Sequence, residues 1–100
     1  IRSGNVSEEE LEPLLRSSLK DSNIQVREQA VSGLSRLSNN STEDLRSLLQ
    51  DDSPSVRLML VDSVKMNEAG KQLLSQATQD PDQTVREYAQ LRLTTNNKPR

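Results

Sequence analysis

The sequence contains no histidine, cysteine, tryptophan or phenylalanine, and Tyr88 is its only aromatic residue. Without histidine and cysteine, the chain cannot supply histidine-based acid–base catalysis, a cysteine nucleophile, a Cys/His zinc site, haem ligation or a disulfide. The longest uninterrupted apolar run is the four residues 58–61, which is too short to span a bilayer. We therefore expect no enzyme of these classes and no membrane partner.

What the chain does contain is a modest, leucine-rich supply of apolar residues. Of its 100 residues, 31% are hydrophobic and 24 are Leu, Ile or Val, which is above the ~20% level at which disorder becomes the default expectation. This length suits one domain or a piece of a larger one. The formal net charge of −2 does not favour a nucleic-acid-binding surface. We predict a thin aliphatic core, no nucleic-acid partner and no cofactor.

An internal repeat, marked by the dipeptide Val-Arg, is the strongest feature of the sequence. The dipeptide occurs at 26–27, 56–57 and 85–86, with spacings of 30 and 29 residues. An aspartate stands five residues before each valine. The repeated acids are Asp21, Asp51 and Asp80, and the repeated arginines are Arg27, Arg57 and Arg86.

Each Val-Arg opens an amphipathic helix. Apolar residues stand at the valine and again four and eight residues after it, a spacing that lines one face of a helix with 3.6 residues per turn. A second helical pattern precedes each aspartate, and the polar turns between the two are short, which makes each pair antiparallel. No strand pattern competes. The expected pairs are 8–20 with 24–37, 42–50 with 54–66, and 68–79 with 83–94.

Pro13 lies inside the first expected helix and allows two interpretations. A proline in a helix interior removes one backbone hydrogen bond and costs about 3 kcal/mol. Either Glu12 caps a helix that begins at Pro13, or a longer helix is kinked at this residue.

A helix, a short acidic turn and a second helix that opens with Val-Arg, repeated about every 30 residues, resembles the HEAT repeat family. The resemblance covers residues 8–94, and the short period is similar to the HEAT-like repeats of bacterial proteins, including relatives of bilin lyases. It implies an all-α fold, an α-α superhelix (solenoid) of three helical hairpins with about six helices. The first helices would form its convex side and the second helices its concave side. The implied repeats are 8–38, 39–66 and 67–94, between a frayed N-terminal end at 1–7 and a flexible tail or linker at 95–100.

The resemblance also implies a role for the repeated acids and arginines. In the family these residues form a ladder that bridges neighbouring turns. Carried over to this chain, the resemblance implies that Asp21, Asp51 and Asp80 would pair with Arg27, Arg57 and Arg86. We interpret the six residues as architecture. The alternative is an arginine row for anionic ligands, which would need free guanidinium groups. The six ladder residues are Asp21, Arg27, Asp51, Arg57, Asp80 and Arg86.

The third repeat departs from the pattern in a way that suits a terminal cap. Gln90 stands where the first two repeats have Val31 and Val61, and a polar outer side is what a capping repeat needs. The chain is either a small complete domain or a segment of a longer solenoid. We favour the second interpretation, so that further repeats or domains of one parent chain count among the expected partners.

The second helices carry the candidate binding surface, because solenoids bind partners on their curved face. Leu58, Asp62 and Leu91 stand two or six residues after the repeated valine and point away from the core stripe. Met59 and Tyr88 flank them, and Met and aromatic residues are enriched at interfaces. We predict that these five residues form a partner-binding patch. The alternative is that Met59 and Tyr88 fill gaps between repeats and that Leu91 belongs to the core.

Three functions remain in view. The preferred one is a non-enzymatic protein–protein interaction or scaffold module, whose protein partner binds the concave face. The second is an accessory domain or subunit of an enzyme, such as a bilin-lyase-like complex. The third, nucleic-acid binding as in HEAT-like DNA glycosylases, needs a cationic groove, whereas Glu28, Asp62 and Glu87 here oppose Lys65. A metal site like that of deoxyhypusine hydroxylases is excluded by the missing histidine, and the cytoplasm is the default location.

Overall fold

All regular structure in the described part of the chain is helical. The structure, a computed structural model, describes residues 8–37 and 45–96, and no strand occurs in these ranges. The all-α class expected from the sequence is confirmed. The elements are α1 (Glu8–Ser18), α2 (Ile24–Arg36), the 3₁₀ helix η1 (Ser47–Gln50), α4 (Pro54–Ser63), α5 (Glu68–Ala77) and α6 (Gln83–Asn96).

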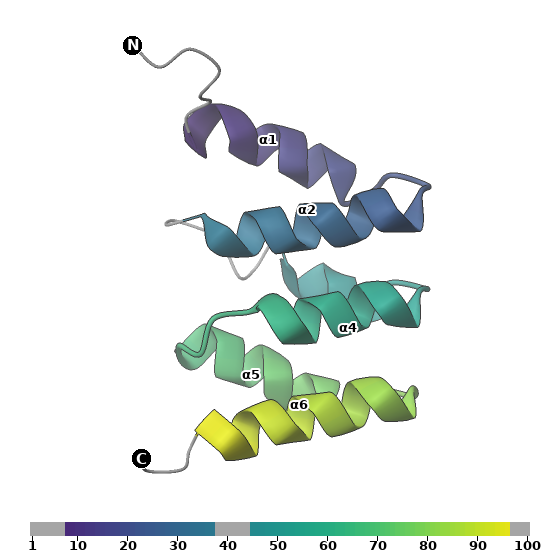
Figure 1. Ribbon diagram of the computed structural model, residues 1–100, viewed down its shortest axis with the longest axis vertical. Helices are drawn as coiled ribbons and strands as arrows, with labels where there is room; N and C mark the ends of the chain where they lie inside the picture. Colours follow the sequence, from purple (N-terminus) through teal and green to yellow (C-terminus); the bar gives the residue numbers. More distant parts are fainter. Residues whose placement is uncertain (1–7, 38–44, 97–100) are drawn as a thin grey trace.

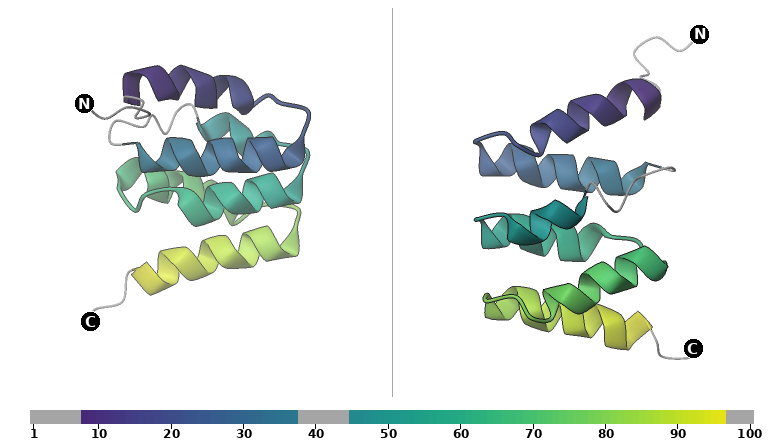
Figure 2. Two further views of the ribbon diagram at one scale, coloured as in Figure 1. Left: turned by 45° about the horizontal axis from the view of Figure 1, so that its top comes forward. Right: turned by 180° about the vertical axis from the view of Figure 1, so that it is seen from behind.

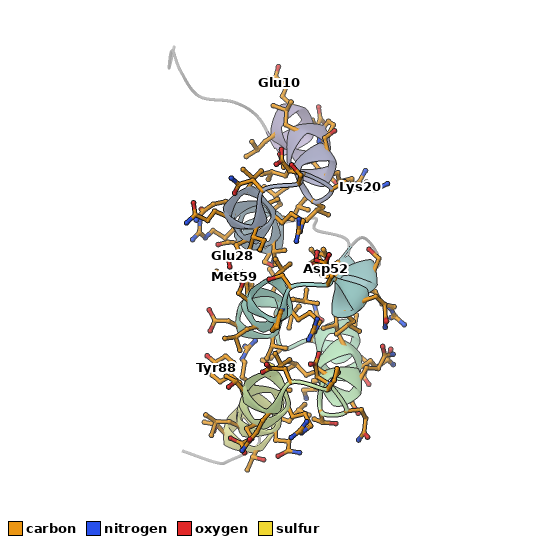
Figure 3. The ribbon with its side chains drawn as sticks, turned by 90° about the vertical axis from the view of Figure 1, so that its right-hand side faces the viewer. Glu10, Lys20, Glu28, Asp52, Met59 and Tyr88 are labelled. Atoms are coloured by element: carbon orange, nitrogen blue, oxygen red, sulfur yellow. The ribbon has the colours of Figure 1, made fainter. Side chains whose placement is uncertain are left out.

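The helices form a two-layer stack of three hairpins (Figure 1). The second helices α2, α4 and α6 lie one above another in one layer, and η1 and α5 lie behind them, as the rear view in Figure 2 shows. Helix α2 packs on α4, and α4 packs on α6. The shortest extent of the molecule is 18 Å, which suits two layers of helices whose axes lie ~8–10 Å apart. In Figure 3 the turns that join the helices of each hairpin face the viewer.

Helices α1, α2, α4 and α5 begin where expected and end one to three residues before the expected bounds, and the two remaining elements differ as well. Residues 45–46 are α-helical and continue into the 3₁₀ helix η1, so that the helix expected at 42–50 ends in a tighter turn. Helix α6 runs to Asn96, two residues past the expected end, because no glycine or proline interrupts it. The frayed end expected at 1–7, the start of the 42–50 helix and the last four residues of the expected tail lie outside the described residues.

Helix α1 runs through Pro13. The interpretation in which a helix begins at Pro13 is therefore wrong. Proline has no N–H to donate to the carbonyl of Glu9, so one backbone bond of the helix is lost. The helix persists across this residue because Leu11 and Leu15, on either side of it, still pack against the core.

A side-chain cap starts each second helix, two residues after the ladder aspartate. In all three repeats the side-chain oxygen of the cap accepts a hydrogen bond from the N–H of the repeated valine, at 3.1–3.4 Å. Such a cap satisfies a backbone donor that has no partner within the helix and contributes about 1 kcal/mol. The caps are Asn23, Ser53 and Asp82.

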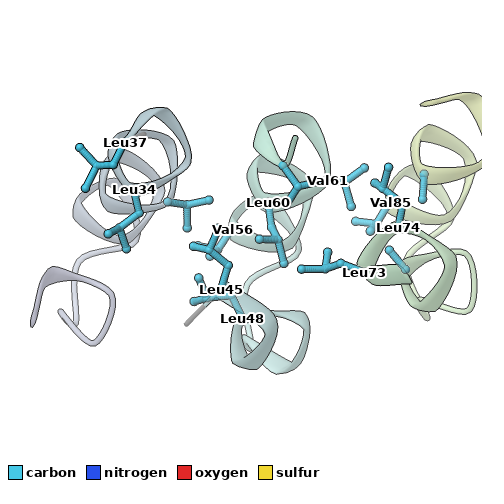
Figure 4. Close-up of a cluster of buried hydrophobic side chains, with 14 residues drawn as sticks. Leu34, Leu37, Leu45, Leu48, Val56, Leu60, Val61, Leu73, Leu74 and Val85 are labelled. Atoms are coloured by element: carbon cyan, nitrogen blue, oxygen red, sulfur yellow. The ribbon is translucent and has the colours of Figure 1, made fainter. Parts of the chain in front are cut away.

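The core is a continuous apolar seam between the two layers and between the hairpins (Figure 4). The predicted stripe occupies it: Val56, Leu60 and Val64 are buried in the middle hairpin. Val31 and Val61, five residues after the repeated valines, are 0% exposed. Their burial reflects the packing of α2 on α4 and of α4 on α6. The seam fixes the relative positions of the second helices, and with them the surface that these helices carry.

Candidate functional site

The outer surface of the second helices, called here the second-helix face, carries a groove of about 440 Å³. Glu28, Met59 and Tyr88, contributed by α2, α4 and α6, follow one another along this face (Figure 3). The groove thus reaches across all three hairpins. It is lined by Glu28, Ser55, Leu58, Met59, Asp62, Thr84 and Tyr88.

Four of the five residues predicted to bind a partner meet in this groove: Leu58, Met59, Asp62 and Tyr88. Leu58, Met59 and Tyr88 are half-buried and also pack against the core. These three residues therefore both fill gaps between repeats and lie on an accessible surface, since one side of each side chain packs inward and another lines the groove. Asp62 is exposed at the groove's edge.

Tyr88 is held across the groove by Asp62. Its hydroxyl donates a hydrogen bond to Asp62 Oδ1 at 2.6 Å, which links α6 to α4. The pKa of Tyr88 is raised mainly by this bond to a carboxylate, and to a lesser extent by partial burial and by the negative charge of Asp62. The nearby positive charge of Arg92 lowers it. The ring is thus fixed as one wall of the groove.

Leu91 lies outside the groove. Its side chain is 56% exposed, so it does not belong to the core, and it lines a separate hollow of about 220 Å³ together with Tyr88, Arg92 and Thr95. Tyr88 is the residue common to both hollows. The five-residue patch is therefore divided, with Leu91 beside the groove and the other four residues within it.

Arg92 and Lys65 each cap the C-terminal end of a helix in the preceding repeat. The sequence did not predict this role for them. Arg92 Nη1 donates to the carbonyl oxygens of Val61 and Val64 at 2.7 and 2.9 Å, at the end of α4. Lys65 Nζ donates to the carbonyl of Leu37 at 3.0 Å, at the end of α2. Cations stabilise helix C-termini by satisfying free carbonyls and opposing the helix dipole. The sequence offered no signal, because each contact joins residues about 30 positions apart.

The ladder aspartates and arginines contact each other in a register that is staggered by one repeat. Arg27 Nε and Nη2 donate to the carboxylate of Asp51 at 3.0 and 3.2 Å. In the same way, Arg57 donates to the carboxylate of Asp80 at 2.8 and 3.2 Å. The third donor, Nη1, serves the aspartate of the same repeat through its backbone, since Arg27 Nη1 lies 2.8 Å from the carbonyl oxygen of Asp21. Each inner arginine therefore joins two successive turns.

The arrangement leaves no row of free arginines in the inner repeats. The Arg57–Asp80 pair is enclosed, with side-chain exposures of 11% and 3%. Both Arg27 and Arg57 use their two-donor edge on a carboxylate, which is the geometry of the strongest charged hydrogen bonds. An anionic ligand would have to displace a carboxylate that is already bound, so the geometry favours architecture over ligand binding.

The outermost ladder residues are placed like the inner ones, but within the described part of the chain neither meets a side-chain partner from a neighbouring repeat. Arg86 Nη1 donates to the carbonyls of Asp80 and Pro81 at 3.0 and 3.1 Å. Asp21 Oδ1 accepts a hydrogen bond from the N–H of Asn23 at 2.8 Å. Among residues 8–37 and 45–96, no carboxylate meets Arg86 and no arginine meets the carboxylate of Asp21.

The described residues contain no group of three or more acidic, histidine or cysteine side chains placed to hold a metal ion. None of the helices in the same ranges is long and apolar enough to cross a membrane.

The family model for HEAT repeats matches residues 4–65, more than half of the chain. The chain belongs to the HEAT repeat family. The match ends after the second hairpin, and the third hairpin continues the pattern with its own ladder aspartate, cap and Val-Arg helix start. HEAT repeats are commonly protein-interaction or scaffold modules and are typically non-enzymatic. Comparisons with curated proteins and with solved structures gave no significant match.

Proposed function

We propose that this HEAT-repeat chain is a non-enzymatic protein-interaction module that binds a protein partner in the groove on its second-helix face. The observation that carries the proposal is the groove itself, which is lined by Leu58, Met59 and Tyr88 and crosses three stacked helices. Apolar and aromatic side chains that are anchored on one side and accessible on the other are the usual energetic centre of a protein interface.

The groove suits a protein better than a small polar ligand. Its lining is mainly apolar, through Leu58, Met59 and Tyr88, and Glu28 and Asp62 contribute polar groups beside them. An apolar centre with a polar rim is the common anatomy of a protein interface. The accessory-enzyme role expected as the alternative is the special case in which the partner is an enzyme, and it would use the same surface.

The rigidity of the groove supports the same role. Leu58 and Met59 come from a helix that is fixed between two neighbours, and Tyr88 is fixed by its bond to Asp62. A surface that is already ordered loses little conformational entropy when a partner binds. The groove is therefore formed before the partner arrives.

Affinity capture followed by reconstitution with the purified partner tests this function. We expect Leu58→Glu to weaken binding of the partner at least ~10-fold, because a carboxylate would have to be buried in the apolar interface. Ile24→Glu is the matched control, since it makes the same change at an exposed apolar residue, 44% exposed, that does not line the groove. Circular dichroism shows whether both variants are folded. Equal binding by the wild type and a folded Leu58→Glu variant would place the interface elsewhere.

A further inference from the structure

The two ends of the stack present the two halves of one ladder contact. Within the molecule this contact is made twice, from Arg27 to Asp51 and from Arg57 to Asp80. Arg86 has the same backbone anchor as the inner arginines, because its Nη1 also donates to the carbonyl of the aspartate in its own repeat. Its Nε and Nη2 meet no carboxylate within the described ranges. The C-terminal end of the stack therefore offers a guanidinium edge.

Asp21 offers the complementary carboxylate at the other end. In all three repeats the ladder aspartate accepts a hydrogen bond from the backbone N–H two residues later, at 2.8–2.9 Å. This bond holds the three carboxylates in the same orientation relative to the turn that follows. Those of Asp51 and Asp80 also receive an arginine from the preceding repeat, whereas no described arginine side chain contacts the carboxylate of Asp21.

Leu14 shows that the N-terminal end also has an uncovered apolar residue. It stands seven residues before its ladder aspartate, as Leu73 does in the third repeat. Leu73 is 0% exposed and points from α5 toward the second hairpin (Figure 4), whereas Leu14 is 63% exposed. The same register position is thus buried in α5, which stacks on the second hairpin, and exposed in α1, the first helix that the structure describes. A hairpin stacked on this end would cover Leu14 and supply an arginine to Asp21.

The C-terminal end is more polar than the inner stacking surfaces. Gln90 is exposed and stands in the register of Val31 and Val61, which are 0% exposed between repeats. Replacing a buried valine by glutamine removes apolar burial from a stacking contact. Stacking on this end is therefore weaker than stacking inside the molecule.

From these observations we propose that a second copy of this chain stacks head to tail on the first, with Arg86 of one copy bound to Asp21 of the next. The contact repeats the ladder step already made twice within the molecule and covers Leu14. Charge complementarity fixes the direction, because a face-to-face dimer would place two aspartates, or two arginines, against each other. Because Gln90 lies in the contact, the association is reversible and depends on concentration.

The symmetry of this contact predicts how the assembly grows. A head-to-tail contact that does not close into a ring leaves a free end on every assembly. We expect a series of species whose average mass rises with protein concentration, and not a single closed dimer.

Charge exchange tests the contact by sedimentation velocity over a range of concentrations. Asp21→Arg alone places two arginines in the contact, and Arg86→Asp alone places two aspartates there, so each variant is expected to remain monomeric. In an equimolar mixture, every contact between one variant and the other pairs an arginine with an aspartate, so alternating assemblies can form and the mass of the mixture should rise again. Gln72→Arg, which adds an arginine at an exposed position of α5, is the matched control and should associate like the wild type.

A variant with tighter self-association keeps the proposal testable even if the charge-exchanged variants fail to fold. Gln90→Val installs the residue that the inner repeats carry, and it should tighten self-association roughly tenfold or more through apolar burial. The proposal is overturned if the wild type and Gln90→Val both stay monomeric at the highest concentration, or if the charge-exchanged variants fail to associate when mixed. Leu58→Glu should leave the self-association unchanged, so that failure of the groove assignment and failure of the stacking contact are told apart.

Discussion

At the residue scale, each inner ladder arginine divides its guanidinium donors between two turns. Arg57 binds the carboxylate of Asp80 in the next repeat and the carbonyl of Asp51 in its own. The flat guanidinium can make these bonds together because its donors are fixed in one plane, whereas a lysine has a single flexible ammonium group. The residue type at this position therefore follows from the geometry of the stack.

Arg57→Ala is expected to lower the free energy of unfolding by about 3–5 kcal/mol, because it leaves the carboxylate of Asp80 buried without its partner. Chemical denaturation followed by circular dichroism measures the change. Asp52→Ala is the control: Asp52 also binds a ladder arginine, Arg27, but its side chain is 94% exposed, so its removal should change stability by less than about 1 kcal/mol. Equal losses in the two variants would mean that burial of the pair does not matter.

Tyr88 provides a pH-dependent readout of the groove. Its hydrogen bond to Asp62 raises its pKa, so the tyrosinate absorbance of the folded protein should appear at a higher pH than that of the unfolded chain, which titrates near pH 10. Because the folded pKa is the higher one, this bond contributes its full stability below about pH 10 and loses it as the pH rises through the folded pKa.

The same titration on Asp62→Asn should show a lower midpoint than the wild type, because the variant has lost the negative charge and the carboxylate acceptor. The assignment is unambiguous, since the chain has no other tyrosine and no tryptophan. An unchanged midpoint in the variant would show that the bond to Asp62 is not made in solution.

At the element scale, short polar turns decide where the helices begin. The second helices start at side-chain caps, and α5 starts in the same way, with Asn67 Oδ1 accepting a hydrogen bond from the N–H of Gly70 at 2.8 Å. The chain turns tightly before α5: a Cβ atom on Gly70 would lie 1.7 Å from the backbone carbonyl oxygen of Lys65. Gly70 is thus required by the turn, despite its low intrinsic preference for helices.

Gly70→Ala is therefore expected to destabilise the protein by more than about 1 kcal/mol, although alanine favours helices over glycine by about that amount. Thermal and chemical unfolding measure the loss. Gly33→Ala is the matched substitution within a helix, and a Cβ there would lie 3.1 Å from the side-chain methyl groups of Leu15, which can shift. Its effect should be smaller, and an equal or greater loss at Gly33 would refute this account of the α5 turn.

At the scale of the whole molecule, the middle hairpin connects the other two. Helix α4 packs on both α2 and α6. The ladder residues of the middle hairpin, Asp51 and Arg57, contact the hairpins on either side. Leu60, which is 0% exposed, lies in the centre of this helix. In repeat proteins stability is carried largely by contacts between neighbouring repeats, so damage to the middle hairpin should be felt throughout the stack.

Leu60→Ala is expected to cost about 2–5 kcal/mol. In both the variant and the wild type, denaturation followed by Tyr88 fluorescence should coincide with denaturation followed by circular dichroism, because unfolding is then a single transition. Tyr88 reports on the third hairpin, whereas circular dichroism reports on all helices. A fluorescence transition that precedes loss of helix would show that the third hairpin unfolds independently of the others.

The sequence by itself determined the repeat, the all-α class, the buried stripe and the residues of the ladder. These features follow from local patterns, because the 3.6-residue period and the recurring Asp and Val-Arg positions can be read from one segment at a time. The same patterns pointed to Leu58, Met59, Asp62 and Tyr88. The spacing of the repeats could not show whether these side chains meet in one hollow.

Only the tertiary structure decided which repeats the side chains join. The stagger from Arg57 to Asp80, the bond from Tyr88 to Asp62 and the separation of Leu91 from the groove all depend on the shift and rotation between successive hairpins. Side-chain packing between α2, α4 and α6 sets that shift. Helical periodicity specifies the face on which a residue lies, but it contains no information about the neighbour that this face meets.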